Sequence, residues 1–377
     1  MQSPEERLTG IMKGCGVDLV GTLPCDRIKC LIGLVCRDFF HIPLTREEEG
    51  VGIAAGAALA GRKPALIIQN SGVGNMINAL VSLTGYYRFP LAVFVSHRGV
   101  YKEKIAAQIP MGEKVAGILR ATGVPYSIIN TVRDFGTIEK KLPEVYRQGL
   151  MHAFLLTPAV WEETKDSVPP SPVIKLTDSV ACRLPAGPGS ATSRPKLTRY
   201  EILKTIAPKL AGKVVVCNLG IPAKELYSLK HQASNFYMLG SMGMATPIGL
   251  GIALSSAKEV VVIDGDGSIL MNPGTLATAA YFSPRNLTVL CIDNGAYGST
   301  GSQPTLTCSG VDLETVAQGF GIRDTLKVSG RKQLTEALKS GGFRFIHALA
   351  LPGNADVPNI PLDRLEIKKQ VEAFLKG

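Results

Sequence analysis

Short apolar runs alternate with amphipathic stretches along most of the chain. Runs of about five to seven apolar residues are typical of buried strands, and the stretches between them repeat apolar residues at helical spacing. This alternation predicts an α/β fold, in which each mostly parallel sheet carries helices on both faces. The expected strands are Val17–Gly21, Phe39–Pro43, Pro64–Gln69, Pro90–Ser96 and Ala153–Leu156, followed by Lys213–Asn218, Glu259–Asp264, Leu287–Asp293 and Phe343–Ala350.

The alternation fades between residues 167 and 196, which are rich in proline, glycine and serine. Such a composition is typical of a linker between domains. We therefore expect two domains, 1–166 and 197–377, without a residue-level repeat between them. Each half opens with the residue pattern of a helix-capping box, beginning at Ser3 and at Thr198.

The composition predicts a globular protein. Of 377 residues, 45% are hydrophobic, which is enough to build sizeable cores. No apolar run reaches the roughly 18 residues of a membrane span. The N-terminus lacks the basic and apolar regions of a signal peptide. We therefore expect a cytoplasmic protein without membrane contact. The eight cysteines form no C-x-x-C pair and fit reduced core residues better than disulfides or a zinc site.

The net charge of +10 allows several kinds of partner. Lysine and arginine are dispersed along the chain, with no run of five or more and few aromatic residues between them. This distribution does not favour nucleic-acid binding. A small anionic substrate fits the charge better.

A polar turn follows the apolar run Val260–Asp264. It places Asp266 between Gly265 and Gly267, and the next predicted strand ends before Asn294. Because neighbouring parallel strands end at one edge of a sheet, the two polar side chains can converge although 28 positions separate them. Their oxygens suit Mg²⁺, which commonly combines one or two side chains with phosphate oxygens.

Helix is expected to resume only some residues after this turn. No helix is expected to continue directly from Asp266, whereas Asn272 can cap and Pro273 can start a short helix that Pro284 ends. A Gly-Asp-Gly turn alone is common in unrelated loops, and the second polar turn, Asp293-Asn294-Gly295, is what favours a binding site.

The segment from Gly265 to Asn294 closely resembles the diphosphate-binding motif of thiamine diphosphate enzymes, which begins with GDG and ends in two asparagines. This chain has Asp293-Asn294 instead of two asparagines and keeps the ligand position. The resemblance implies that 197–377 is a diphosphate-binding domain and that Asp266, Asn294 and the main-chain oxygen of Ala296 bind Mg²⁺. It also implies that a larger set contacts thiamine diphosphate, with Met242 supporting the folded cofactor: Gly240, Ser241, Met242, Gly265, Asp266, Gly267, Ser268, Asn294, Ala296, Tyr297 and Gly298.

In the first half, TREEEGVGIAAGA and QNSGVGN resemble the pyrimidine-binding domain of the same enzymes, here residues 1–166. The resemblance selects Glu47, nine residues before Gly56, as the glutamate that hydrogen-bonds N1′ of the pyrimidine and promotes loss of the C2 proton. It places Ser71 and Gly72 at the same site. Without the resemblance, Glu47 is interpreted as a solvated acid at a helix start.

The chain also resembles the sulfopyruvate decarboxylases of coenzyme M synthesis in methanogens, with their two subunits fused in one chain. The segments that carry this resemblance are TREEEGVGIAAGA and QNSGVGN again, together with SHRG, QIPMG and DNGAYGSTGSQPT. The resemblance implies decarboxylation of 3-sulfopyruvate, a small anionic 2-oxo acid, to sulfoacetaldehyde and CO₂. It also implies active sites between subunits of a dimer or higher oligomer. Candidates for binding the substrate are Ser71, His97, Arg98, Lys102, Gln108, Ser299 and Thr300, and His97 is also a catalytic candidate for a protonation step.

Two alternative functions are kept. Phosphonopyruvate decarboxylases have the same layout and a similar substrate. A catalytically silent thiamine diphosphate-binding or assembly subunit is the other alternative, although the presence of Glu47 together with Asp266 and Asn294 argues against it. A nicotinamide dehydrogenase is not supported, because SGVGN lacks the G-x-G-x-x-G spacing.

Overall fold

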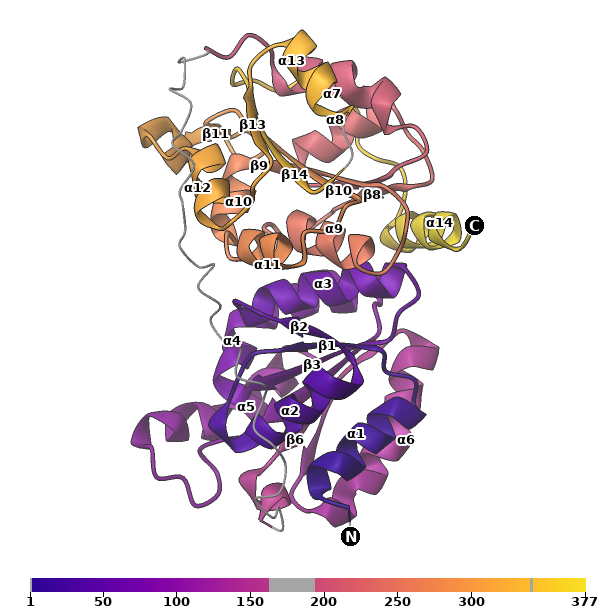
Figure 1. Cartoon of the computed structure of the whole chain (residues 1–377), viewed down its shortest axis with the longest axis vertical. Helices are drawn as coiled ribbons and strands as arrows, with labels where there is room; N and C mark the ends of the chain where they lie inside the picture. The colour runs from indigo at the N-terminus through magenta and orange to yellow at the C-terminus, as the bar shows by residue number, and fades with distance from the viewer. Residues whose placement is uncertain (1, 163–193, 340–341) are drawn as a thin grey trace. The chain divides into compact units, whose positions relative to one another are not determined.

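The structure is a computed structural model that describes residues 2–162, 194–339 and 342–377. The chain divides into two compact units, Met1–Thr177 and Asp178–Gly377 (Figure 1). Each unit is described by itself. Residues 167–193 of the expected linker lie outside the described residues.

The N-terminal unit is built on a six-stranded parallel sheet with the order β2-β1-β3-β4-β6-β5. The central strand β4 is buried along its whole length because both faces of the sheet are covered. The strands are β1 (Leu19–Thr22), β2 (Phe40–Pro43), β3 (Pro64–Gln69), β4 (Leu91–Ser96), β5 (Tyr126–Ile129) and β6 (Met151–Leu156).

Helices cover both faces of this sheet (Figure 1). α3 and α4 pack together on one face with α5, and α1 packs with α2 and α6 on the other. The side chains of α1 reach a core that includes Val20, Ile67 and Phe94. The helices are α1 (Pro4–Gly14), α2 (Lys29–Asp38), α3 (Glu47–Leu59), α4 (Asn70–Ala79), α5 (Ile109–Ala121) and α6 (Phe135–Gln148).

The C-terminal unit also has a six-stranded parallel sheet, ordered β13-β14-β10-β9-β7-β8. When strands are numbered within each unit, both sheets read 2-1-3-4-6-5, so the units share one topology without a repeated sequence. The strands are β7 (Val214–Cys217), β8 (Asn235–Tyr237), β9 (Val260–Gly265), β10 (Leu287–Asp293), β13 (Thr325–Val328) and β14 (Arg344–Leu349), with a separate hairpin of β11 (Ala296–Tyr297) and β12 (Gln303–Pro304).

Helices again lie on both faces: α7, α8 and α13 on one, and α9 and α11 on the other (Figure 1). These two parallel sheets with helical layers confirm the predicted fold class. The helices are α7 (Arg199–Ile206), α8 (Ile221–Leu229), α9 (Ala245–Ala253), α10 (Asp266–Met271), α11 (Thr275–Phe282), α12 (Leu313–Gly319), α13 (Arg331–Ala337) and α14 (Arg364–Lys376).

The capping boxes predicted at Ser3 and Thr198 are both present. The prediction for the stretch after β9 is wrong in two respects. Helix α10 begins at Asp266 itself, because Gly265 is extended and acts as the N-cap residue. The following helix starts at Thr275 instead of Pro273, and no side chain caps it.

The sequence pattern does not predict β5, β8 or β13. Each has only three or four residues and forms an edge of its sheet. β5 and β13 are also partly exposed. Short edge strands need no continuous apolar run, so hydrophobic periodicity detects them poorly.

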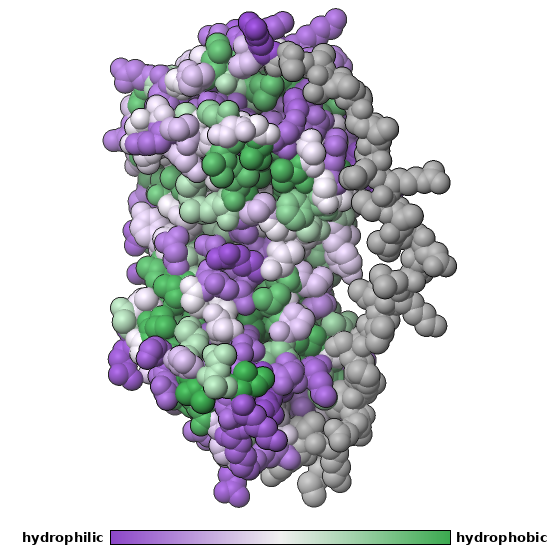
Figure 2. Space-filling view, turned by 90° about the vertical axis from the view of Figure 1, so that its left-hand side faces the viewer, coloured by the Kyte–Doolittle hydropathy of each residue, from purple (hydrophilic) through white to green (hydrophobic). Residues whose placement is uncertain are grey.

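Within the described residues, the structure contains no helix that is both long and apolar enough to span a bilayer. On the face shown in Figure 2, hydrophilic and hydrophobic residues are interspersed over both units. Exposed large apolar residues also occur in both, for example Ile105 and Tyr281.

Candidate active site

The C-terminal unit contains a pocket at the carboxyl ends of β7 and β9. The strand order reverses direction here, because β7 has β8 on one side and β9 on the other. A reversal of this kind leaves a crevice at the carboxyl ends of the strands, which is the usual ligand site of open α/β sheets. The pocket contains all the predicted cofactor and substrate residues of this half except Gly240 and Ser241: Met242, Gly265, Asp266, Gly267, Ser268, Asn294, Ala296, Tyr297, Gly298, Ser299 and Thr300.

Asp266 is one of two buried carboxylates that line this pocket, with 3% of its surface exposed; the other is Asp264. Its Oδ2 accepts a hydrogen bond from Thr305 Oγ1 at 2.5 Å and lies 3.2 Å from Thr307 Oγ1. Burial raises the pKa of Asp266, and the nearby charge of Asp293 acts in the same direction, while the Thr305 hydrogen bond partly opposes them. A cation beside Asp266 would favour its ionised form.

Asn294 lines the same pocket from the end of β10. Its Oδ1 lies 3.4 Å from the Ala296 amide nitrogen, and its Nδ2 is buried without a hydrogen-bond partner among the described residues. The main-chain oxygen of Ala296 already accepts a bond from the Gly298 amide at 3.0 Å and retains a second lone pair. Asp266, Asn294 and Ala296 therefore bring three kinds of oxygen donor to one pocket.

This donor set fits Mg²⁺ with a bound diphosphate. Among the described residues, no group of three or more His, Cys, Asp or Glu side chains could hold a metal, so a cation here would depend on carboxylate, amide, carbonyl and phosphate oxygens, which are the ligands Mg²⁺ prefers. A Cβ on Gly267 would lie 2.3 Å from the Tyr297 ring, so only glycine leaves this wall of the pocket open.

The turn that carries Met242 is joined to helix α10, which begins at Asp266. Ser241 has φ +59°, an uncommon conformation for a residue with a side chain, and strain of this kind concentrates at binding sites. The Gly243 amide donates to Ser268 Oγ at 3.1 Å. Ser241 thus belongs to a turn hydrogen-bonded to α10, while Met242 itself lines the pocket.

Sequence reasoning missed several residues of this pocket and its surroundings. Arg199 lines the pocket and is held by Glu225 at 2.8 Å, and Asn218 follows β7 at the same edge. Thr305 and Thr307 contact Asp266 from a later segment. Thr305 ends the segment DNGAYGSTGSQPT, but no sequence pattern assigned a role in the site to it or to the other three residues, because each reaches the site through tertiary folding.

In the N-terminal unit, Glu47 is the first residue of α3 and only 5% exposed, which is unusual for a glutamate at a helix start. Its Oε2 accepts a hydrogen bond from Asn75 Nδ2 at 3.0 Å. A Cβ on Gly72 would lie 2.0 Å from Glu47 Oε1, so the carboxylate packs directly on the backbone of α4. The predicted pair of Glu47 and Gly72 is therefore in contact, and Asn75 is a partner that the sequence did not identify.

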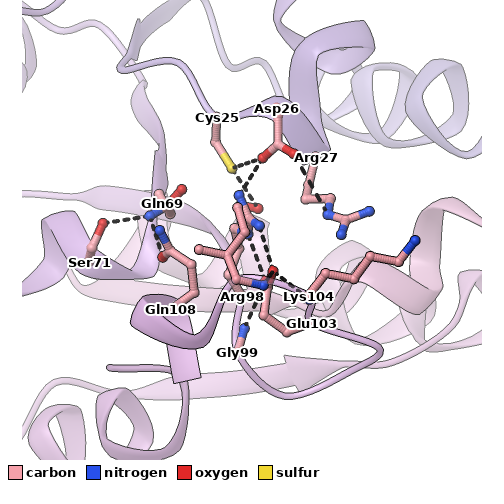
Figure 3. A network of polar contacts seen from close by, with 12 residues as sticks. Cys25, Asp26, Arg27, Gln69, Ser71, Arg98, Gly99, Glu103, Lys104 and Gln108 are labelled. Atoms are coloured by element: carbon pink, nitrogen blue, oxygen red, sulfur yellow. Dashed lines mark hydrogen bonds and ion pairs between the residues drawn. The ribbon is translucent and has the colours of Figure 1, made fainter. Parts of the chain in front are cut away.

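Ser71 and Gln108, both predicted to bind substrate, are brought together by Gln69. Gln69 Nε2 lies 2.7 Å from Ser71 Oγ and 2.9 Å from Gln108 Oε1, and Figure 3 shows the three side chains directed toward one another. Ser71 neighbours Gly72 in the chain, so this polar cluster lies close to Glu47. Gln69 is the first residue of the segment QNSGVGN and lies at the end of β3, but the sequence assigned it no role.

Arg98 is also drawn in Figure 3, but its guanidinium already has partners. It bonds both oxygens of Glu103 at 2.7 and 2.9 Å, and Asp26 at 2.5 Å, and is 4% exposed. Arg98 holds the pKa of Glu103 at about 2. In this structure Arg98 anchors the loop after β4 and presents no free charge to an anion.

His97 and Lys102 are likewise engaged. His97 Nε2 lies 2.8 Å from the Gly112 carbonyl oxygen, and its Nδ1 is buried without a partner among the described residues. Burial lowers the pKa of His97. The ring is therefore neutral and donates through Nε2. Lys102 Nζ pairs with Glu162 at 2.6 Å on the surface. These contacts do not favour direct substrate contact by either residue.

Comparison with known proteins connects both units to one enzyme family. Residues 218–348 match the family model "Thiamine pyrophosphate enzyme, C-terminal TPP binding domain". A sulfopyruvate decarboxylase of Methanosarcina acetivorans is 43% identical over 99% of this chain and 98% of its own length. The chain belongs to the sulfopyruvate decarboxylase family of thiamine diphosphate enzymes. It is accordingly a decarboxylase.

Other relatives agree with this membership. A phosphonopyruvate decarboxylase of Streptomyces viridochromogenes is 34% identical over 97% of this chain and 93% of its own length. The beta subunit of a sulfopyruvate decarboxylase of Methanococcus maripaludis is 48% identical over 48% of this chain and 99% of its own length. The alpha subunit from the same organism is 42% identical over 40% of this chain and 92% of its own length. The chain thus corresponds to a fusion of the two subunits.

Solved structures support the fold. A protein of Mycobacterium smegmatis assigned as a thiamin diphosphate-dependent enzyme matches with a TM-score of 0.71 at 15% identity, over 94% of this chain and 100% of the other. Benzoylformate decarboxylase of Polynucleobacter necessarius matches with a TM-score of 0.64 at 14% identity, with the same coverage. At this identity the likeness concerns the fold alone.

Proposed function

We propose that this member of the family decarboxylates 3-sulfopyruvate to sulfoacetaldehyde and CO₂, with thiamine diphosphate and Mg²⁺, as a step of coenzyme M biosynthesis in the cytoplasm. The observation that carries the proposal is the 43% identity to a sulfopyruvate decarboxylase over 99% of the chain. This similarity extends across both units.

The C-terminal unit would hold the diphosphate end of the cofactor. Asp266, Asn294 and the main-chain oxygen of Ala296 would bind Mg²⁺, since all three line one pocket. Gly265 and Gly267 leave room for phosphate oxygens, because neither places a side chain in the pocket.

Glu47 would hold a proton on the pyrimidine nitrogen. Its carboxylate is suited to this role because burial removes competing water and Asn75 fixes one oxygen. When bound, thiamine diphosphate supplies the carbon that adds to the keto group and takes up the electron pair released with CO₂. Residues 1–166 would then be the pyrimidine-binding domain and 197–377 the diphosphate-binding domain.

Among the substrate candidates, the contacts best support Ser71 and Gln108, because Gln69 orients both near Glu47. Ser299 and Thr300 line the pocket of the C-terminal unit and keep their proposed role. Arg98, Lys102 and His97 would need to give up their present partners first.

Self-association is part of the proposal. The relatives that match the separate halves are named as subunits alpha and beta, so in those proteins the two parts act as partners. We expect a dimer or higher oligomer, which light scattering on the purified chain will measure.

A competition assay tests the proposed substrate. Purified protein with Mg²⁺ and thiamine diphosphate receives equal concentrations of 3-sulfopyruvate and 3-phosphonopyruvate, and the two aldehydes and CO₂ are quantified. We expect sulfoacetaldehyde to dominate. Predominant phosphonoacetaldehyde would favour the alternative that the 34% identity to a phosphonopyruvate decarboxylase suggests. No CO₂ from folded protein with either substrate would end the proposal.

A further inference from the structure

A segment not predicted to belong to the metal site bridges its two turns. It comprises Thr305–Cys308, which follows strand β12 and includes most of a 3-10 helix at Leu306–Ser309. We call these four residues the threonine brace. Leu306 is 66% exposed, whereas Thr305 is 2% exposed, so the brace turns its threonines inward.

The first contacts of the brace are with Asp266. Thr305 Oγ1 donates to Asp266 Oδ2 at 2.5 Å, and Thr307 Oγ1 lies 3.2 Å from the same oxygen. The two hydroxyl oxygens are themselves 2.8 Å apart. Thr305 therefore donates to this carboxylate oxygen and Thr307 packs against it, which together restrict the orientation of the carboxylate at the start of α10.

The second contacts are with the turn that carries Asn294. Thr307 Oγ1 donates to Asp293 Oδ1 at 2.8 Å, while the Thr305 amide and Cys308 Sγ donate to the Gly295 carbonyl oxygen at 3.0 and 2.8 Å. The brace is thus bonded on both sides of Asn294.

Asp293 is well suited to receive these bonds. Its Oδ1 also accepts from the Gly295 amide at 3.0 Å, and its Oδ2 lies 2.8 Å from His347 Nε2. A carboxylate offers two acceptor oxygens, whereas an asparagine offers one. The local structure therefore explains why this chain has an aspartate where the family motif has its first asparagine: Asp293 accepts hydrogen bonds from Thr307 and His347 on different oxygens.

We infer that Thr307 is a positioning residue for the metal ion. It contributes no ligand. Its hydroxyl donates to Asp293 and lies in contact with Asp266 Oδ2, so the side chain sets the separation of two turns that lie far apart in the sequence. The inference rests on the proposed Mg²⁺ site. Mg²⁺ requires near-ideal octahedral geometry, so loosening one turn relative to the other weakens binding even when every ligand is present.

The test uses Mn²⁺ as the metal probe, with thiamine diphosphate present, and measures free Mn²⁺ by electron paramagnetic resonance. Thr307→Val keeps the branched shape and removes the hydroxyl, and we expect it to raise the Kd for Mn²⁺ by about 10- to 100-fold. Thr307→Ser keeps the hydroxyl and should restore affinity. Thr205→Val is the control, because that hydroxyl bonds only the Glu201 carbonyl of its own helix, at 2.7 Å.

The outcomes are distinguishable. If the wild-type protein takes up no Mn²⁺, the proposed metal site itself fails. If the wild type binds Mn²⁺ and Thr307→Val binds it equally well, the positioning role is overturned, even if the variant unfolds at a lower temperature. If Thr307→Val does not fold, Thr307→Ala replaces it, and unchanged affinity in that folded variant overturns the inference.

Discussion

The contact between Gly72 and Glu47 allows a sharp test of the proposed pyrimidine site. In Gly72→Ala, the new Cβ would lie 2.0 Å from Glu47 Oε1, and ordinary contact begins at 3.4 Å, so the carboxylate has to move by 3.4 − 2.0 = 1.4 Å. Its bond to Asn75, now 3.0 Å long, would be lost or distorted. A misplacement of about 1 Å at a reacting group can cost about 10²-fold in rate, or about 2.7 kcal/mol of activation free energy.

Gly74→Ala is a matched control on the same helix. A Cβ there meets only Met111 Cε, at 3.7 Å, which is ordinary contact, so turnover should be unchanged and stability equal or higher by up to about 1 kcal/mol. The assay is the initial rate of CO₂ release at saturating cofactor, with circular dichroism to verify folding. If folded Gly72→Ala turns over as fast as Gly74→Ala, Glu47 is not the positioned acid that we propose.

Two further predictions concern charged residues. Glu47→Ala should reduce turnover by at least about 10²-fold and leave the unfolding temperature near that of the wild type, and wild-type rates in that variant would refute the assignment. Arg98 depresses the pKa of Glu103 to about 2, so this pair stabilises the fold above the ordinary glutamate pKa of about 4.3 and the stabilisation is lost as pH falls toward 2. Thermal unfolding between about pH 5 and pH 2.5 should therefore show a smaller loss of stability in Glu103→Gln than in the wild type, and equal losses would mean that the ion pair contributes nothing.

The sequence was sufficient for the class of fold, because alternating apolar runs and amphipathic stretches have few packed solutions. β3, with the bounds Pro64–Gln69, matches its prediction because a continuous apolar run ends there at polar residues. The sequence was insufficient to predict short edge strands such as β5, whose residues are half exposed and carry no distinctive pattern. The start of α10 was also predicted wrongly from the sequence, since a glycine at the N-cap leaves no side-chain signal.

At the candidate site, local motifs identified the residues that share a turn, whereas partners from distant segments appeared only in the folded chain. Asp266 and Asn294 could be paired from the sequence because parallel strands end at one edge of a sheet. Nothing along the chain indicates that Thr307 reaches both Asp266 and Asp293, or that Asn75 holds Glu47. Nor does the sequence show that Arg98 is neutralised by Glu103. Hydrogen bonds and ion pairs depend on distances of a few ångströms, and the packing of helices and strands sets these distances after the pattern of apolar residues has specified the fold.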